Sequence, residues 1–367
     1  MRKPLRHRWS ADWRPAIQTV LAQIPLNAIQ SMELITGAPS AEFGDKTSLV
    51  VNANTKSGLG QKPNGSFVAQ YGSFGTVAEE TSVGFGSARF GNFVAANAVR
   101  SGRFLDTPEF RPSHAIGNNY TIFDRLDFQL SSQDSLHLNL FQARNWFQIP
   151  NTNDQPGQDQ RQKTLTYNVA PGYQRTFSAK TLLTINPFYR QDKVDYYPSA
   201  DRFHDSPLSP QQSRGLLNWG VRADVNRVSG IHNLKIGTQL MQTRLREQFA
   251  FGITDAGYNA VCVDGNGDPQ ELPNITDPNR CAPRGLTVNP DLQPGLIPYD
   301  LTRGGRLFSF ADRTNINQYA FYVQDTISLG HFSISPGLRL DHYAGLSTDT
   351  QAQPRIGVSI SFLALAR

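Results

Sequence analysis

The sequence predicts an all-β fold, an antiparallel transmembrane β-barrel, and three observations lead to that prediction. Apolar and polar residues alternate over long stretches, as side chains do on the two faces of a strand. The stretches come in pairs that are joined alternately by short turns and by long polar loops. The polar face of each stretch is rich in charge, which distinguishes the pattern from that of a soluble β-sandwich.

Residues 122–140 show the pattern most clearly, as two stretches around the turn 131–134. Because the side chains of a strand alternate with a period of two, each stretch has one apolar and one polar face. The apolar face carries Leu126, Phe128, Leu130, Leu136, Leu138 and Leu140, and the polar face carries Arg125, Asp127, Gln129, His137 and Asn139.

The composition is compatible with one barrel. A chain of 367 residues can form a single barrel or two to three ordinary domains, and its 30 glycines and 23 prolines suit many strands and turns. The mean hydropathy of −0.42 does not argue against a membrane location, since a barrel strand is apolar only at every second residue. No apolar stretch reaches the roughly 18 to 20 residues of a membrane-spanning helix, so a membrane location requires strands.

The charge distribution excludes a nucleic-acid partner. The net charge is +5, and no basic run occurs beyond Arg2-Lys3 and Arg6-His7-Arg8, whereas nucleic-acid binding needs a clustered basic face. Residues 1–23 stay unassigned. They begin with basic residues like an export signal, but the apolar core that such a signal needs is interrupted by polar residues and proline, so we expect no signal peptide in this chain.

From residue 65 to residue 367 we expect about twelve strands of a partial outer-membrane β-barrel, counted as period-two segments. Short turns are expected at 89–92, 131–134, 177–180, 228–231 and 329–331, and long loops at 102–118, 149–161, 197–213 and 250–315. Short turns of such barrels face the periplasm and long loops face outside, so residue 65 enters from the periplasmic side. The apolar faces would contact outer-membrane lipid.

Charged residues of the expected strands fall on the faces that would point into the lumen. An Arg or Lys on the lipid face costs roughly 2 to 4 kcal/mol at the bilayer midplane, so the lumen face is the low-energy place for charge. Two roles are open for these residues, contact with a domain inside the barrel or solvation of the lumen. The candidates are Arg125, Asp127, Arg222, Asp224, Arg339 and Asp341.

No pattern in the sequence points to catalysis, a metal site or a cofactor. There is no His-Glu-x-x-His, no Cys/His quartet, no Gly-x-Ser-x-Gly and no phosphate-binding or dinucleotide-binding loop. Residues 264–268 resemble the first half of a calcium loop, but Pro269 replaces the required glycine and Ile275 replaces the bidentate glutamate. We therefore expect no enzyme activity.

Cys262 and Cys281 both lie in the longest polar stretch of the chain. A disulfide between them would suit an oxidising compartment such as the periplasm or the cell surface. Two unpaired thiols are the alternative, because spacing alone does not fix connectivity.

Residues 24–60 are too few to bury a core of their own and are expected to dock against something larger. They resemble the C-terminal half of the plug domain of TonB-dependent outer-membrane receptors, where a strand runs into a glycine, a small-acidic-aromatic-glycine turn follows, and a second strand ends in Thr-Lys-Ser-Gly before the barrel. The residues of this motif are Gly37, Glu42, Phe43, Gly44, Asn52, Thr55, Lys56 and Gly58. Segments 319–326, 337–341 and 353–359 look like strands of the large-loop subgroup often called Oar-like.

The resemblance implies a plugged barrel of about 22 strands that imports a scarce ligand with energy passed on by the TonB complex. Compared with that family, the chain lacks the first half of the plug, the TonB-contacting segment, a signal peptide and about ten strands of the closed barrel. Thr47-Ser48-Leu49 also stands where the family commonly has a glycine pair. We therefore expect a fragment of a longer protein.

Two other functions are compatible with the sequence. An adhesin-like or structural outer-membrane barrel would bind a partner through the loop 250–315 and transport nothing. A soluble β-protein or carbohydrate-binding enzyme would bury the apolar faces in a closed protein interior. No motif selects the ligand of a transporter, and iron chelates, cobalamin and oligosaccharides are all open.

Overall fold

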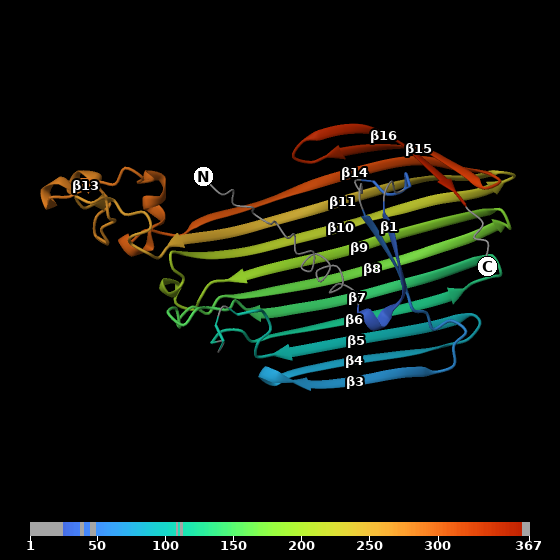
Figure 1. Cartoon of the computed structure of the whole chain (residues 1–367), viewed down its shortest axis with the longest axis horizontal. Helices are drawn as coiled ribbons and strands as arrows, with labels where there is room; N and C mark the ends of the chain where they lie inside the picture. Colours follow the sequence, from blue (N-terminus) through green and yellow to red (C-terminus); the bar gives the residue numbers. More distant parts are fainter. Residues whose placement is uncertain (1–24, 37–39, 45–48, 108, 111–112, 362–367) are drawn as a thin grey trace, which may run out of the picture.

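The computed structural model describes residues 25–36, 40–44, 49–107, 109–110 and 113–361. Residues 1–23 and the motif residue Gly37 lie outside these ranges. The described chain is all-β, as predicted, and its main element is one antiparallel sheet of twelve strands in the order β16-β15-β14-β11-β10-β9-β8-β7-β6-β5-β4-β3 (Figure 1). The sheet is open, because β3 and β16 each have one neighbouring strand within the described chain.

Most strands pair with their neighbours in the chain, and β11 pairs with β14 across the longest connection. The sheet consists of β3 (Asn64–Gly72), β4 (Thr76–Gly86), β5 (Phe90–Ser101), β6 (Gly117–Gln129), β7 (Asp134–Gln148), β8 (Arg161–Ser178), β9 (Thr181–Tyr197), β10 (Leu208–Ser229), β11 (His232–Ile253), β14 (Phe308–Leu329), β15 (Phe332–Ala344) and β16 (Thr348–Ile360). Short 3-10 helices are η1 (Leu26–Ala28), η2 (Ser73–Gly75), η3 (Arg202–His204), η4 (Pro278–Arg280), η5 (Ala282–Arg284), η6 (Pro294–Tyr299) and η7 (Leu301–Arg303). None of the described helices is long and apolar enough to cross a membrane.

The two ends of the sheet differ in their connections. Tight turns such as Gly230-Ile231 and Gly330-His331 lie at one end, where both glycines have a positive φ that other residues rarely adopt. The long connections 102–116, 149–160, 198–207 and 254–307 gather at the other end, on the left in Figure 1. The alternation of short and long connections is therefore present as the sequence predicts.

The expected loops 197–213 and 250–315 were too long, because β10, β11 and β14 each have 22 residues. A strand needs only about 9 to 11 residues to cross a bilayer. The apolar side of β10 runs from Leu217 to Val225, and the part of the strand before it carries polar or small residues on that side. The period-two pattern is weak in that first part of β10, so the sequence predicts a loop although the strand is paired with β11 throughout.

The sheet has two faces of different chemistry. We call the face that carries the β1–β2 hairpin the inner face, and the opposite one the outer face. Large apolar side chains such as Trp219, Leu240 and Phe321 are 43 to 51% exposed on the outer face. Asp124 is an exception to the apolar character of this face, and its carboxylate accepts a hydrogen bond of 2.5 Å from the Asn92 side chain on the neighbouring strand.

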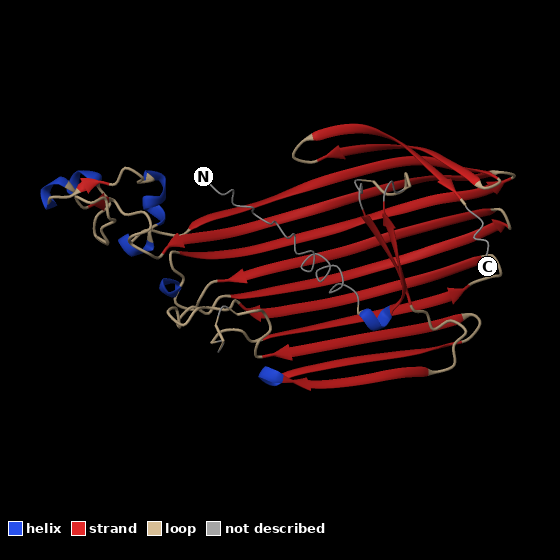
Figure 2. Ribbon diagram, viewed as in Figure 1, coloured by secondary structure: helices blue, strands red, loops and turns tan. Residues whose placement is uncertain are grey.

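Residues 25–60 form what we call the inner segment, made of η1, β1 (Ile29–Thr36), β2 (Leu49–Thr55) and the stretches around them. The hairpin crosses the inner face obliquely to the sheet strands (Figure 2). Ala28 is fully buried against Phe93, Ala95, Phe123 and Phe141 of the sheet. A segment too short to form its own core thus uses the sheet as its second layer.

The connection 254–307 contains a small unit of its own. Strands β12 (Cys262–Val263) and β13 (Thr287–Val288) pair in it, and Val261, Ile275 and both cysteines are buried together. Cys262 and Cys281 form a disulfide with a Cα–Cα distance of 5.6 Å. This unit extends beyond the ends of β11 and β14 (Figure 1).

We expect the disulfide to hold this unit closed. Replacing both cysteines by serine removes a cross-link over 19 residues, and a loop of similar length is worth about 3 kcal/mol. Trypsin should then cut after the exposed Arg280 and Arg284 at least about tenfold faster, because cleavage follows the population of the open loop. Trypsin cleavage within the sheet strands should not change. Equal cleavage rates after Arg280 and Arg284 in both proteins would contradict the prediction.

Candidate functional site

The candidate site is the contact between residues 40–44, which we call the tip segment, and the inner face of five strands. Glu42 lies at its centre. Its carboxylate accepts a hydrogen bond of 2.6 Å from Lys235 Nζ on β11 and one from the Arg222 guanidinium on β10, and Ser40 Oγ donates a third at 2.9 Å. Asp224 is 3.5 Å from Lys235 Nζ and adds a second carboxylate to the group.

Arg339 on β15 binds the main chain of the same tip segment. Its Nη1 donates to the carbonyl oxygens of Ala41 and Glu42 at 3.4 and 3.1 Å, while its Nε donates to both oxygens of Asp341 at 2.9 Å. Gln324 on β14 accepts a hydrogen bond of 2.6 Å from the Ala41 amide. Arg355 on β16 donates to the Ser40 carbonyl oxygen at 3.0 Å. The tip segment is therefore held through its main chain as well as through Glu42.

Tyr322 forms the floor of the site. It is fully buried, its hydroxyl accepts a hydrogen bond of 3.3 Å from Arg222 Nε, and the Arg222 and Arg339 guanidinium groups both lie 5.8 Å from its ring centre. A guanidinium group at that distance from an aromatic ring interacts favourably with it. Gly237 leaves room for the ring, because a Cβ atom there would come within 2.4 Å of it.

Small residues allow the tip segment to approach the sheet closely. A Cβ atom on Gly44 would lie 2.5 Å from the Arg339 guanidinium, and one on Gly337 would lie 3.1 Å from the Ala41 Cβ. Ala41 itself is fully buried. The glycine of the Glu42-Phe43-Gly44 turn is thus required by contact distance, and Phe43 stacks on the Arg222 guanidinium at 5.7 Å.

A second contact fastens the end of the inner segment to β6. Arg125 donates to the Thr55 carbonyl oxygen at 3.1 Å and to its hydroxyl at 2.9 Å, and it also pairs with Asp127 at 2.8 Å. Asp127 in turn accepts a hydrogen bond of 2.6 Å from the Ser57 hydroxyl. Gly58 follows immediately, and a Cβ atom there would lie 2.1 Å from the Asn92 carbonyl oxygen of β5.

The electrostatics of the tip site favour an ionised Glu42. Burial acts to raise the pKa of this carboxyl, but the Lys235 hydrogen bond together with the charges of Lys235 and Arg222 outweighs it. The pKa of Glu42 is therefore below its ordinary value of 4.5. Removing one member of such a half-buried ionic group leaves a charge of another member without its partner, which destabilises the contact.

The structure brings most of the candidate residues of the sequence into these two contacts. Arg222, Asp224, Arg339 and Asp341 surround the tip segment, and Arg125 and Asp127 hold the end of β2. Asn52 is not part of either contact: its amide lies 3.5 Å from Glu33 on the exposed hairpin. Lys56 lies over the Phe93 ring at 5.9 Å.

Four further residues of the tip site were not selected from the sequence, namely Lys235, Tyr322, Gln324 and Arg355. All four sit on the polar side of their strands, which is the available signal. Alternation gives the face of a residue but not its height along the barrel axis.

Aromatic rings line the inner face near the long loops. Phe308 on β14 lies 5.5 Å from Phe249, 5.2 Å from Phe251 and 5.2 Å from Tyr299, measured between ring centres. Phe249 and Phe310 remain 37 and 41% exposed. Among the described residues, no group of three or more His, Cys, Asp or Glu side chains is placed to hold a metal ion.

Comparisons with known proteins agree with this architecture. The family model of the TonB-dependent receptor-like β-barrel matches residues 53–363, and no curated protein matches the chain. Among solved structures, the unliganded ferric citrate transporter FecA superposes with a TM-score of 0.60 at 14% identity, covering 92% of this chain and 47% of that one. The ferric yersiniabactin uptake receptor FyuA from Yersinia pestis gives a TM-score of 0.62 at 12% identity, with 90% and 48% covered.

The copper transporter OprC gives a TM-score of 0.60 at 10% identity, with 90% of this chain and 47% of that one covered. The TM-scores show a shared fold, and at 10 to 14% identity the likeness goes no further than the fold. This chain spans about half the length of the structures it matches. The family and these neighbours are receptors and transporters rather than enzymes. From its matched barrel and its sheet of twelve strands, the chain belongs to the TonB-dependent receptor-like β-barrel family, whose barrels are outer-membrane proteins.

Proposed function

We propose that this chain is part of a receptor that imports a scarce ligand through a plugged barrel with energy from the TonB complex. Residues 24–60 are the C-terminal part of the plug, and β3 to β16 are one part of the wall, of the large-loop Oar-like type. The open edges β3 and β16 pair with further strands in a closed barrel, since unpaired backbone groups in hydrocarbon cost several kcal/mol each. The half-length coverage of the matched structures supports this proposal.

The observation that supports it most is the ionic contact of the tip segment. Glu42 is bound by cations from two strands, and the tip main chain is bound from three more. A purely structural contact could be apolar, which is often as stable as a buried ion pair. Polar contacts can instead be exchanged for water when the segment moves. We therefore assign the tip site to holding the plug closed until force is applied to it.

The exposed rings of Phe249 and Phe310 lie near the long loops, where a ligand enters first. Aromatic surfaces of this kind bind ligands with flat or apolar parts. The names of the matched structures make ferric citrate, ferric yersiniabactin and copper the first ligands to try.

A structural or adhesin-like barrel is the second candidate function. The ordered unit in the connection 254–307, with its own core and disulfide, favours it because such a unit could bind a partner outside the membrane. Energy dependence separates the two functions, since an adhesin needs no TonB complex.

Cross-linking the tip segment to the wall should abolish transport. In the full-length receptor, Ala41→Cys with Gly337→Cys places two Cβ atoms about 3.1 Å apart, close to the 3.5 to 4.5 Å usual for a disulfide. Energised cells should take up radiolabelled ferric citrate or copper only when this bond is reduced. Each single variant and the unmodified receptor with reductant are the controls. Uptake by the oxidised double variant, or uptake that persists after a protonophore, would contradict the proposal.

Removing the Glu42 charge should loosen the tip segment without unfolding the sheet. In Glu42→Gln, Arg222 and Lys235 lose their shared carboxylate, and hydrogen bonds to charged groups contribute about 1.5 to 3 kcal/mol. A cysteine in place of the fully buried Ala41 should then react with a soluble maleimide about tenfold faster or more.

Glu33→Gln is the matched control, because Glu33 is also a glutamate of the inner segment and its carboxylate accepts from Asn52 on the exposed hairpin. Equal labelling rates in the Glu42 and Glu33 variants would show that the carboxylate does not hold the tip segment.

The contact should persist in mild acid. Because docking lowers the pKa of Glu42, the ionised form stabilises the docked state fully above pH 4.5, and this contribution disappears as the pH falls through the lowered value. Protection of the cysteine at position 41, probed with a dithiodipyridine reagent that reacts with thiols in acid, should therefore be retained at pH 4.5 and lost only at lower pH. This loss of protection at low pH should be absent in Glu42→Gln, which has no carboxyl group to protonate at that position. A midpoint above pH 4.5 would show the opposite sign of the pKa shift.

A further inference from the structure

The outer face of β11 and β14 carries three arginines beyond the apolar band. Arg246 is the register partner of Arg313, and Arg244 is the partner of Asn315, so the three guanidinium groups share one face. All three residues are exposed, and no hydrogen bond or ion pair joins their side chains to another part of the described chain. Like charges directly opposite each other in a sheet are destabilising, so folding alone does not account for this pair.

The arginines surround a hollow of about 580 Å³. Its lining comprises Arg244, Leu245, Arg246, Arg313, Thr314 and Asn315. Because side chains alternate along a strand, the backbone of Leu245 and Thr314 forms the floor, and the four outward side chains form the walls. The neighbouring position on β10 is Gly215, which adds no side chain beside Arg246.

On the same face of β9, the strand next to β10, Lys193 is the register partner of Gly215, and the carboxylate beside it already has partners. Asp195 of β9 pairs with Lys193 at 3.1 Å and accepts a hydrogen bond of 2.7 Å from the Ser213 hydroxyl. Glu247 and Asp312, the acidic neighbours of the arginines in the chain, point to the inner face, where Glu247 pairs with Arg214. Within the described residues, the three positive charges therefore have no carboxylate partner on the outer side.

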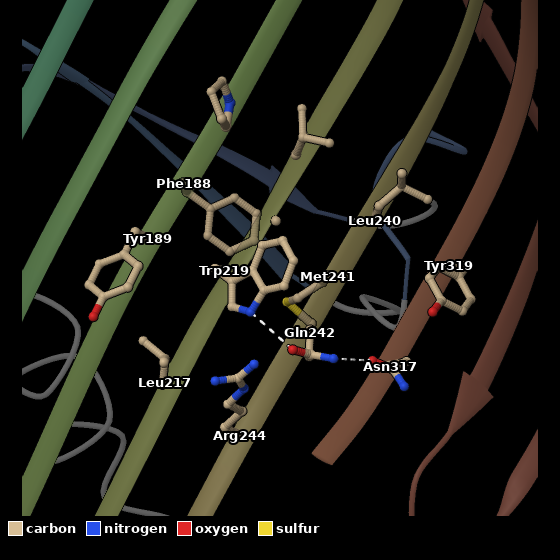
Figure 3. A pocket seen from close by; sticks show the side chains of 13 residues that line it. Phe188, Tyr189, Leu217, Trp219, Leu240, Met241, Gln242, Arg244, Asn317 and Tyr319 are labelled. Atoms are coloured by element: carbon tan, nitrogen blue, oxygen red, sulfur yellow. Dashed lines mark hydrogen bonds between the residues drawn. The ribbon is translucent and has the colours of Figure 1, made fainter.

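An apolar groove of about 790 Å³ adjoins the hollow (Figure 3). Arg244 lines both, so the two lie next to each other on the outer face. Its apolar and aromatic side chains include Tyr189, Leu217, Trp219, Val221, Leu240 and Tyr319.

The height of the arginines matches the headgroup layer of a membrane. Trp219 Nε1 donates to the Gln242 side chain at 3.1 Å, and Gln242 donates to Asn317 at 2.9 Å, which gives a polar row at the edge of the apolar band nearer the long loops (Figure 3). Arg244 and Arg246 lie two and four residues further, about 7 and 14 Å along the strand. If the strand is tilted by about 40° from the membrane normal, they lie about 5 and 10 Å beyond that row along the normal, at the level of lipid headgroups.

We propose that this patch is a binding site for a phosphorylated lipid of the leaflet on the long-loop side, with acyl chains in the apolar groove and phosphate between the arginines. A guanidinium group binds phosphate through two parallel hydrogen bonds, which an ammonium group cannot do. Three uncompensated charges match a headgroup with two phosphates, such as that of lipid A, better than a zwitterionic headgroup. This site is separate from the import of a ligand and lies on the opposite face of the sheet.

The test uses the full-length receptor in detergent micelles with three probes: bisphosphorylated lipid A, the same lipid without phosphate, and inorganic pyrophosphate. Lipid A should raise the thermal unfolding temperature of the unmodified protein. In Arg246→Gln/Arg313→Gln its dissociation constant should rise about tenfold or more, since two charge-assisted contacts are lost. Without lipid this variant should be as stable as the unmodified protein or more so, because the repulsion is removed.

Arg89→Gln/Arg227→Gln is the matched control, with the same change of charge at exposed positions near the short turns. It should retain the response to lipid A. Equal lipid A affinity of the Arg246/Arg313 variant and this control would overturn the proposal. An equal response to pyrophosphate would identify a site for soluble anions instead, and equal binding of the dephosphorylated lipid would reduce the site to its apolar groove.

Discussion

The structure depends on one constraint: in hydrocarbon, every backbone N–H and C=O group needs a partner within the protein. A continuous antiparallel ladder meets this need for the strand interiors from β3 to β16, whatever side chains they carry. The two faces are then free to differ, and alternation places apolar residues on one and charges on the other. Where the chain must put a polar group outward within the band, as at Asp124, a neighbouring side chain supplies the hydrogen bond.

That separation of faces is what makes the ionic tip site feasible. Arg222, Lys235 and Arg339 would be costly on the lipid side, yet on the inner face they are available to bind the tip segment. The inner segment contributes little apolar area of its own, since much of the β1–β2 hairpin is exposed. Its position is therefore fixed at a few points, by Ala28 in the small apolar cluster and by hydrogen-bonded charges at residues 40–44 and 55–58.

The sequence predicts on which face of a strand a residue lies, but it does not predict the position of that residue along the barrel axis. The period of two assigns Arg125, Arg222 and Arg339 to one side of their strands without any structure. It does not show that Arg222 meets a glutamate 180 positions earlier in the chain, because that contact depends on the stagger of five strands. Lys235 and Tyr322 were missed for the same reason. Loop lengths were overestimated at β10, β11 and β14, since alternation fades where both faces of a strand are in water.

Strand β11 shows how one sheet element serves several environments. Its first half places Lys235 inward under the tip segment and Leu240 outward in the apolar band. Its second half turns Arg244 and Arg246 outward and Phe249 and Phe251 inward.

The second half of β11 lies beyond the apolar band, where burial in lipid no longer stabilises it. Its order must therefore come from pairing with β10 and β14 and from the ring contacts with Tyr299 and Phe308. The exposed arginines on its outer side add nothing to that order. Their presence is better explained by what lies outside the wall than by the fold itself.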